Sequence, residues 1–97
     1  MPIQGPADRV TGAFTNICKD GHWTMIVYHN DVVVKFNDKT IILNTCGNWT
    51  QTTKRRMVQA SNQFKLGYYV QQRKGVWYLQ YHDKELVFDN ERVVLRR

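Results

Sequence analysis

Three consecutive cations stand at the point where the sequence predicts that a helix begins. The run Lys54-Arg55-Arg56 follows two threonines that could cap the helix, Thr50 and Thr52. Helix N-termini favour acidic residues, because unpaired N–H groups and the helix dipole create a positive potential there. A bound anion would relieve the conflict, held by backbone N–H groups, the threonine hydroxyls and the Lys54 or Arg56 side chain. We expect this anion to be a nucleic-acid phosphate.

Polar side chains recur on the helix face opposite the predicted apolar stripe. Arg55, Gln59 and Asn62 follow one another at spacings of four and three residues, which places them on one face. Such side chains can make paired hydrogen bonds to base edges or phosphates. The same pattern is also typical of any helix whose outer face meets water. The row therefore fits a nucleic-acid contact without requiring one.

An aromatic residue precedes the cations. Trp49 lies in the predicted loop before the helix, where it is free of an obvious core role and could stack a base. Aromatic residues of the later strands could do the same, although such residues favour strands in any case. The predicted anion- or nucleic-acid-binding residues are Trp49, Thr50, Thr52, Lys54, Arg55, Arg56, Gln59 and Asn62.

Catalytic chemistry finds little support in the sequence. Most of the eight acidic residues lie in predicted turns, where aspartates commonly bond their own backbone. Ser61, the only serine, falls inside the predicted helix rather than at a strand-to-helix turn. A Cys–His pair would require Cys18 or Cys46 to meet a histidine, which no spacing indicates. We therefore predict a non-enzymatic protein without a cofactor.

The cysteines and histidines also permit half of a metal site. Cys18 and His22 are separated by three residues. A structural zinc site normally combines two such close pairs, and the second pair is missing, so no metal site is predicted. We expect Cys18 and Cys46 to be reduced thiols of a cytosolic protein, with Cys46 as a small, partly buried apolar residue.

Short strands are predicted on both sides of one helix. A period of two begins at Trp23, a run of β-branched residues follows at 32–36, and turn residues such as Asn30-Asp31 separate the segments. The predicted strands are residues 23–28, 32–36, 40–43, 68–73, 76–81, 85–88 and 92–95. The helix is predicted from Thr52 to Lys65, with Gly67 ending it.

The pattern predicts one α+β domain. The apolar stripe of the helix comprises Thr53, Met57, Ala60 and Phe64. A stripe of this width needs a sheet to cover it. We expect an antiparallel sheet of about five to seven short strands with one central helix, in the order βββ-α-βββ. Residues 1–20 are predicted to be a flexible N-terminal arm, and residues 21–97 the single domain.

The charge balance favours an anionic partner. Fourteen Lys and Arg residues against eight Asp and Glu give a net charge of +6, which suits nucleic acid, an acidic protein surface or anionic lipid. A membrane span is not expected, because no run of about 20 apolar residues is present. The first residues do not follow the pattern of a secretory signal. We therefore expect a cytoplasmic protein.

The region from Tyr28 to Tyr78 contains four distinctive segments, at residues 32–34, 41–45, 47–57 and 62–67. On these segments the chain resembles a group of short domains of unknown function found mainly in bacteriophage genomes. The most distinctive part is a Trp/Thr-rich entry into a Thr-Thr-Lys-Arg-Arg helix, whereas Cys46 and Val58 depart from the pattern. The resemblance implies a phage-encoded protein of the host cytoplasm and carries no assigned activity.

Two functions follow from these observations. The first is a module that binds nucleic acid, DNA or RNA, through the helix entry. The second is a phage protein that binds and modulates a host protein, such as a defence or transcription factor, by docking the same cations on an acidic surface. The first is favoured, because the cationic helix entry has a direct anion-binding rationale. The oligomeric state stays open.

Overall fold

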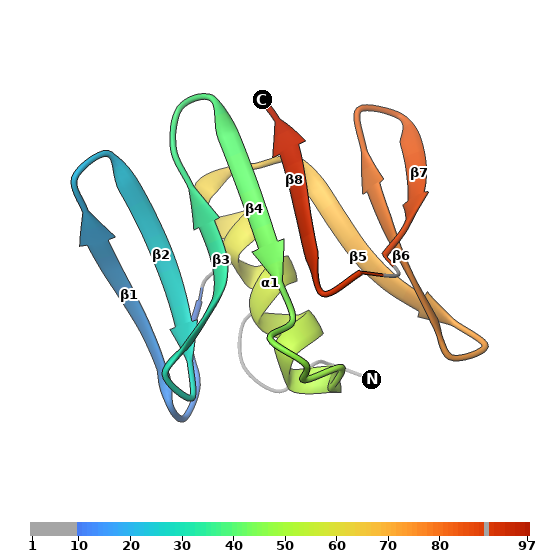
Figure 1. Ribbon diagram of the computed structural model, residues 1–97, viewed down its shortest axis with the longest axis horizontal. Helices are drawn as coiled ribbons and strands as arrows, with labels where there is room; N and C mark the ends of the chain where they lie inside the picture. Colours follow the sequence, from blue (N-terminus) through green and yellow to red (C-terminus); the bar gives the residue numbers. More distant parts are fainter. Residues whose placement is uncertain (1–9, 89) are drawn as a thin grey trace.

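Two antiparallel sheets pack against a single helix in the computed structural model of the protein (Figure 1). The structure describes residues 10–88 and 90–97, and over these residues it contains eight strands and one helix. The strands are β1 (Thr15–Asp20), β2 (Trp23–Tyr28), β3 (Asp31–Phe36), β4 (Thr40–Asn44), β5 (Tyr68–Arg73), β6 (Val76–Tyr81), β7 (Lys84–Val87) and β8 (Arg92–Arg96). The helix, α1, spans Gln51–Phe64.

The strands form two sheets rather than one. Five strands pair in the order β1-β2-β3-β4-β8, and β5, β6 and β7 form a separate three-stranded sheet. All of these pairings are antiparallel, which confirms the predicted mixture of antiparallel strands with one helix. The predicted strand number and βββ-α-βββ order are wrong, since the described chain runs ββββ-α-ββββ. The last strand, β8, returns to pair with β4 in the five-stranded sheet, with Leu95 opposite Ile41.

Strand β1 occupies part of the segment predicted to be a flexible arm (residues 1–20). Thr15–Asp20 pair with β2 along their whole length, so the folded domain begins before residue 21. Within β1 only Thr15 is even half-buried. The strand therefore lacks the alternation of buried apolar residues by which strands are recognised in sequence. The first nine residues of the predicted arm lie outside the described part of the chain.

The predicted apolar stripe of α1 faces the core. Thr53, Met57 and Ala60 are fully buried, and the ring of Phe64 lies 4.9 Å from that of Phe36, between centroids. The five-stranded sheet contributes Ile26, Val33, Val34, Phe36, Ile41, Leu43 and Leu95 to the same core, and the three-stranded sheet contributes Tyr68, Val70, Trp77 and Leu79. The helix is thus buried against both sheets at once.

The helix begins at a predicted cap and ends at Phe64, one residue before its predicted end at Lys65. The Thr50 hydroxyl accepts a hydrogen bond from the backbone N–H of Thr53 at 3.2 Å, which is the geometry of an N-cap. At the other end Lys65 is the C-cap and adopts the left-handed conformation, with φ 56°, and the predicted Gly67 also has a positive φ, of 83°. Leu66 follows immediately and is buried. The left-handed turn at Lys65 therefore leads directly into a residue of the core.

Candidate nucleic-acid interface

One side of α1 lies beneath the segment that precedes β1. We call Arg56, Gln59 and Gln63 the covered side. The backbone N–H of Val10 donates to Gln63 Oε1 at 2.6 Å, and that of Thr11 donates to Gln59 Oε1 at 3.5 Å. Gln59 and Gln63 therefore satisfy the backbone of the N-terminal segment rather than facing a partner.

Arg56 is held within the fold. The residue is only 6% exposed to solvent. The Nε donates to Thr15 Oγ1 at 2.8 Å, and the Nη1 donates to Gln59 Oε1 at 3.1 Å. Burial, with a smaller contribution from the charge of Arg55, lowers the pKa of this guanidinium. Arg56 thus links α1 to the start of β1, which no spacing in the sequence indicates.

The backbone crosses directly over Arg56 at Gly12. A Cβ at this position would lie 1.8 Å from Arg56 Nη2 and 2.5 Å from its Cζ. The φ angle of +140° is also a conformation that favours glycine. Only a residue without a side chain lets the segment pass this close to the guanidinium.

Two features of the predicted site are therefore wrong. The exposed row of Arg55, Gln59 and Asn62 does not exist, because Gln59 is fully buried under the N-terminal segment. The assignment of Arg56 to a bound phosphate fails for the same reason. Helical spacing gives the angular position of a side chain, but it carries no information about a segment that later packs over it.

The other side of α1 borders an open groove. The groove runs between the first half of the helix and β5, and its volume is about 260 Å³. We call its exposed or half-buried helix residues, Gln51, Lys54, Arg55 and Val58, the open side. Strand β5 lines the groove with Tyr69, Val70, Gln71 and Gln72, and the buried Gln59 completes it. Two of the three predicted cations therefore face the same groove.

Lys54 is held against the three-stranded sheet. Its ammonium donates to Gln72 Oε1 at 3.2 Å and lies 5.8 Å from the centroid of the Trp77 ring. Partial burial lowers the pKa of Lys54, because a charged group loses stabilisation when water is removed around it. A phosphate in the groove would restore that stabilisation with a charge-assisted hydrogen bond.

Trp49 belongs to an aromatic cluster beside the groove. Its ring meets those of Trp77 and Phe88 edge to face, at centroid distances of 5.0 and 5.6 Å. Trp77 and Phe88 are buried, whereas Trp49 is 40% exposed. The three rings border a hollow of about 320 Å³ that Gln72 also lines. Because Gln72 lines both spaces, the hollow and the groove adjoin each other.

The remaining predicted residues do not contribute directly to the groove. The Thr50 hydroxyl is engaged as the helix cap and also bonds the Thr53 hydroxyl at 3.0 Å. Thr52 is half-buried, and Asn62 is exposed but does not line the groove. The geometry brings together Trp49, Lys54 and Arg55 and leaves the other predicted residues in structural or peripheral positions.

Residues 7–94 match the family described as Kyanoviridae Gp96 protein. The chain belongs to this family. It is a family of phage proteins of unknown function, which confirms the phage origin that the Trp/Thr-rich helix entry indicated. No curated protein matches the chain, and no solved structure does so either.

Six groove residues were not among the predicted site residues, and three of them are polar or aromatic residues of one strand. Tyr69, Gln71 and Gln72 lie on β5, which follows the helix. The alternation along residues 68–73 did indicate that every second side chain faces away from the core. It could not indicate that the strand would lie beside the open side of α1, since that contact depends on how the two sheets pack around the helix.

The groove of this phage protein is lined by groups that attract anions. Lys54 and Arg55 supply positive charge, and the amides of Gln51 and Gln72 supply further donors. Among the described residues, no carboxylate lines either the groove or the adjoining hollow.

The other chemically active residues have different surroundings. Ser61 is buried and ties α1 to β5, donating to the Tyr68 carbonyl at 2.6 Å and accepting from the Tyr68 N–H at 3.1 Å. Cys18 and Cys46 are free thiols. Burial, followed by the charges of Asp31 and Glu91, raises the pKa of Cys46. Across residues 10–88 and 90–97 there is no cluster of three or more potential metal ligands. Within the same residues, no helix is long and apolar enough to cross a bilayer.

Proposed function

We propose that this phage protein binds nucleic acid in the host cytoplasm through the groove between α1 and β5, and that it does so without catalysis. The observation that carries the proposal is the make-up of the groove. Two cations, several amides and a tyrosine line it, with no carboxylate among the described lining residues. Cations beside amide donors are the groups that proteins use to contact phosphates.

Lys54 and Arg55 carry the proposed phosphate contact. Lys54 is partly desolvated, so it gains more from a phosphate than a fully hydrated lysine does. Arg55 is half-buried on the neighbouring helix position and can offer a paired set of N–H donors. Arg56 has no part in the contact, because its guanidinium already bonds Thr15 and Gln59.

Trp49 adds a base contact to this proposal. Its ring packs edge to face on the buried rings of Trp77 and Phe88, which fix its position, and the residue is 40% exposed. Stacking of a base on such a ring contributes about 1–3 kcal/mol to single-strand binding. Trp49→Ala should therefore weaken binding of single strands by about tenfold, measured by fluorescence anisotropy at constant salt.

The salt dependence of binding tests the phosphate contact. Each phosphate that a cation neutralises releases counterions, so Lys54→Ala and Arg55→Ala should each flatten the log–log salt slope by about one unit on duplex DNA. Lys19→Ala is a matched control, since it removes an exposed cation near the end of β1 that lies outside the groove. It should leave the slope close to that of the wild type.

The same experiment separates nucleic acid from a protein partner. Failure to bind DNA or RNA below about 100 μM at physiological salt would leave only ordinary non-specific attraction and would end the proposal. A pull-down from host lysate with and without nuclease then tests the second function. Capture of an acidic host protein that persists after nuclease treatment, and that Lys54→Ala and Arg55→Ala abolish, would assign the groove to that protein.

A further inference from the structure

The outer face of the three-stranded sheet carries an ordered polar and aromatic surface. Tyr69 lies opposite Gln80 in the β5–β6 register, and Gln71 lies opposite Tyr78. These four side chains share one face, because directly opposed residues of an antiparallel pair point the same way. Tyr69 is 50% exposed. We call these four residues together with Arg73 the sheet platform.

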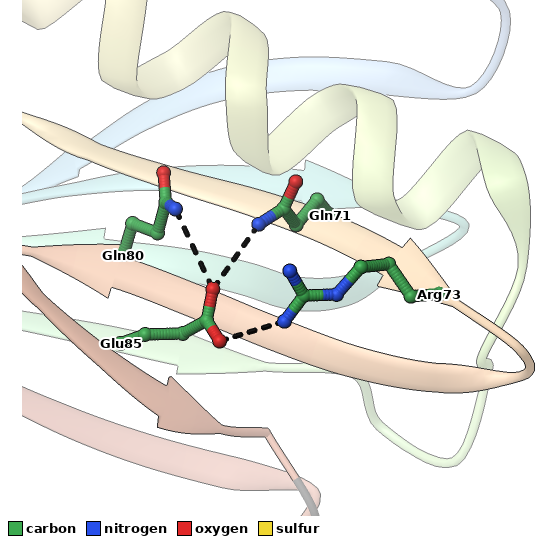
Figure 2. A network of polar contacts seen from close by, with 4 residues as sticks. All are labelled: Gln71, Arg73, Gln80 and Glu85. Atoms are coloured by element: carbon green, nitrogen blue, oxygen red, sulfur yellow. Dashed lines mark hydrogen bonds and ion pairs between the residues drawn. The ribbon is translucent and has the colours of Figure 1, made fainter.

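Glu85 of β7 organises the sheet platform. Figure 2 shows three side chains converging on its carboxylate. Its Oε1 accepts from Arg73 Nη2 at 2.6 Å, and its Oε2 accepts from Gln71 Nε2 at 3.4 Å and Gln80 Nε2 at 3.5 Å. The guanidinium of Arg73 also lies over the Tyr78 ring, 4.1 Å from its centroid. The amides and the guanidinium are therefore held in place on an exposed surface.

The sheet platform and the groove share two residues. Tyr69 and Gln71 line the groove beside Lys54 and Arg55, and they also belong to the outer face of the sheet. The two surfaces differ in charge. The groove has cations without a carboxylate among its described residues, whereas on the platform the charge of Arg73 is compensated by Glu85.

Because of this difference in charge, the groove suits the phosphates of a polynucleotide and the sheet platform suits its bases. Phosphates favour the uncompensated cations of the groove. A phosphate on the platform would meet the Glu85 carboxylate, which repels it, whereas an uncharged base can stack on a tyrosine ring and bond to glutamine amides. Stacking and edge contacts of this kind require bases that are neither stacked nor paired, so they are available in single strands.

We infer that the ligand is a single-stranded nucleic acid whose backbone lies in the α1–β5 groove and whose bases lie on the sheet platform, with Tyr69 as a stacking residue. The inference rests on the proposed function and narrows it. The covered side of α1 supports it independently. The N-terminal segment lies over Arg56 and Gln59, so this side of α1 is not available for insertion into a duplex major groove.

Anisotropy titrations with a labelled single strand and with the same sequence closed into a hairpin duplex test this inference. The single strand should bind at least tenfold more tightly at physiological salt. Tyr69→Ala should lower its affinity by about tenfold while leaving the salt slope unchanged, because a stacked base releases no counterions. Tyr69→Phe should retain the wild-type affinity, since the ring is kept. Phe14→Ala removes an aromatic side chain that is 69% exposed and lies outside the groove, and it serves as the control.

The same titrations also compare the salt slopes of two variants, Arg73→Ala and Lys54→Ala. Arg73→Ala should leave the salt slope unchanged, because Glu85 already compensates that charge, whereas Lys54→Ala should flatten it by about one unit. Equal affinity for duplex and single strand, or a Tyr69→Ala variant within twofold of the wild type, would overturn the inference. So would a slope flattened equally by Arg73→Ala. The proposed function would survive each of these results if Lys54→Ala still flattens the slope, and absence of all binding would end both.

Discussion

Arg55 and Arg56 are neighbours in the sequence, yet they serve opposite sides of α1. Arg56 is almost fully buried and bonds Thr15 and Gln59, whereas Arg55 is half-buried at the groove along β5. A helix turns by about 100° per residue, so consecutive side chains cannot share one surface. The run of three cations therefore has two roles. Arg56 holds the N-terminal segment, whereas Lys54 and Arg55 remain at the groove, where a partner can reach them.

The strongest test of this comparison is removal of the buried cation. Arg56→Ala loses two charge-assisted hydrogen bonds and the packing of a long side chain, so we expect the free energy of unfolding to fall by about 2–4 kcal/mol. Urea unfolding followed by circular dichroism measures the change. Arg55→Ala is the matched control and should stay within about 0.5 kcal/mol of the wild type. Equal losses in the two variants would show that the two sides of α1 do not differ as described.

A smaller effect is expected where the backbone crosses Arg56. Gly12→Ala places a Cβ in the position of the guanidinium and strains a backbone with φ +140°, so it should destabilise the protein by about 1–3 kcal/mol. In an Arg56→Ala background the steric part of the loss should disappear. A double-mutant cycle with denaturant midpoints measures this coupling. Strictly additive losses would show that Gly12 acts through its backbone conformation alone.

The smallest expected effect concerns the protonation of Lys54 on the open side of α1. Burial lowers the pKa of Lys54, so the unfolded chain binds its proton more tightly than the folded protein does. The contribution of Lys54 to stability should therefore rise with pH between its folded pKa and its ordinary value near 10.5. NMR titration of the ammonium group measures the folded pKa directly. Addition of a nucleic acid should raise this pKa, and an unchanged value would argue against a phosphate beside Lys54.

The local elements were predictable because their patterns are local. Alternation, runs of β-branched residues and turn residues marked seven of the eight described strands, and the stripe through Met57 and Ala60 marked the buried face of α1. The cap at Thr50 followed from its hydroxyl and its place before the helix. Strand β1 escaped prediction, since an edge strand with almost no buried residue carries no such pattern.

The candidate site was predictable only in part. Trp49, Lys54 and Arg55 do face one region, because all three lie at the helix entry and on the side that stays uncovered. Gln59 and Arg56 were predicted to be exposed to a ligand, but the N-terminal segment buries both. That segment is more than 40 residues away in sequence, and Thr11 and Gln59, for example, are 48 residues apart. Tyr69 and Gln71 joined the site through the packing of β5.

By itself the sequence determined the elements of this protein, the buried stripe of its helix, its positive charge and its phage affiliation, because propensity, periodicity and motif are properties of neighbouring residues. Only the tertiary structure decided which surfaces those elements expose. The return of β8 to β4 placed the last strand in the five-stranded sheet, apart from β5, β6 and β7, and the crossing of Gly12 over Arg56 removed one cation from the surface. Both are contacts between distant segments, and such contacts depend on the packing of the whole chain rather than on any local pattern.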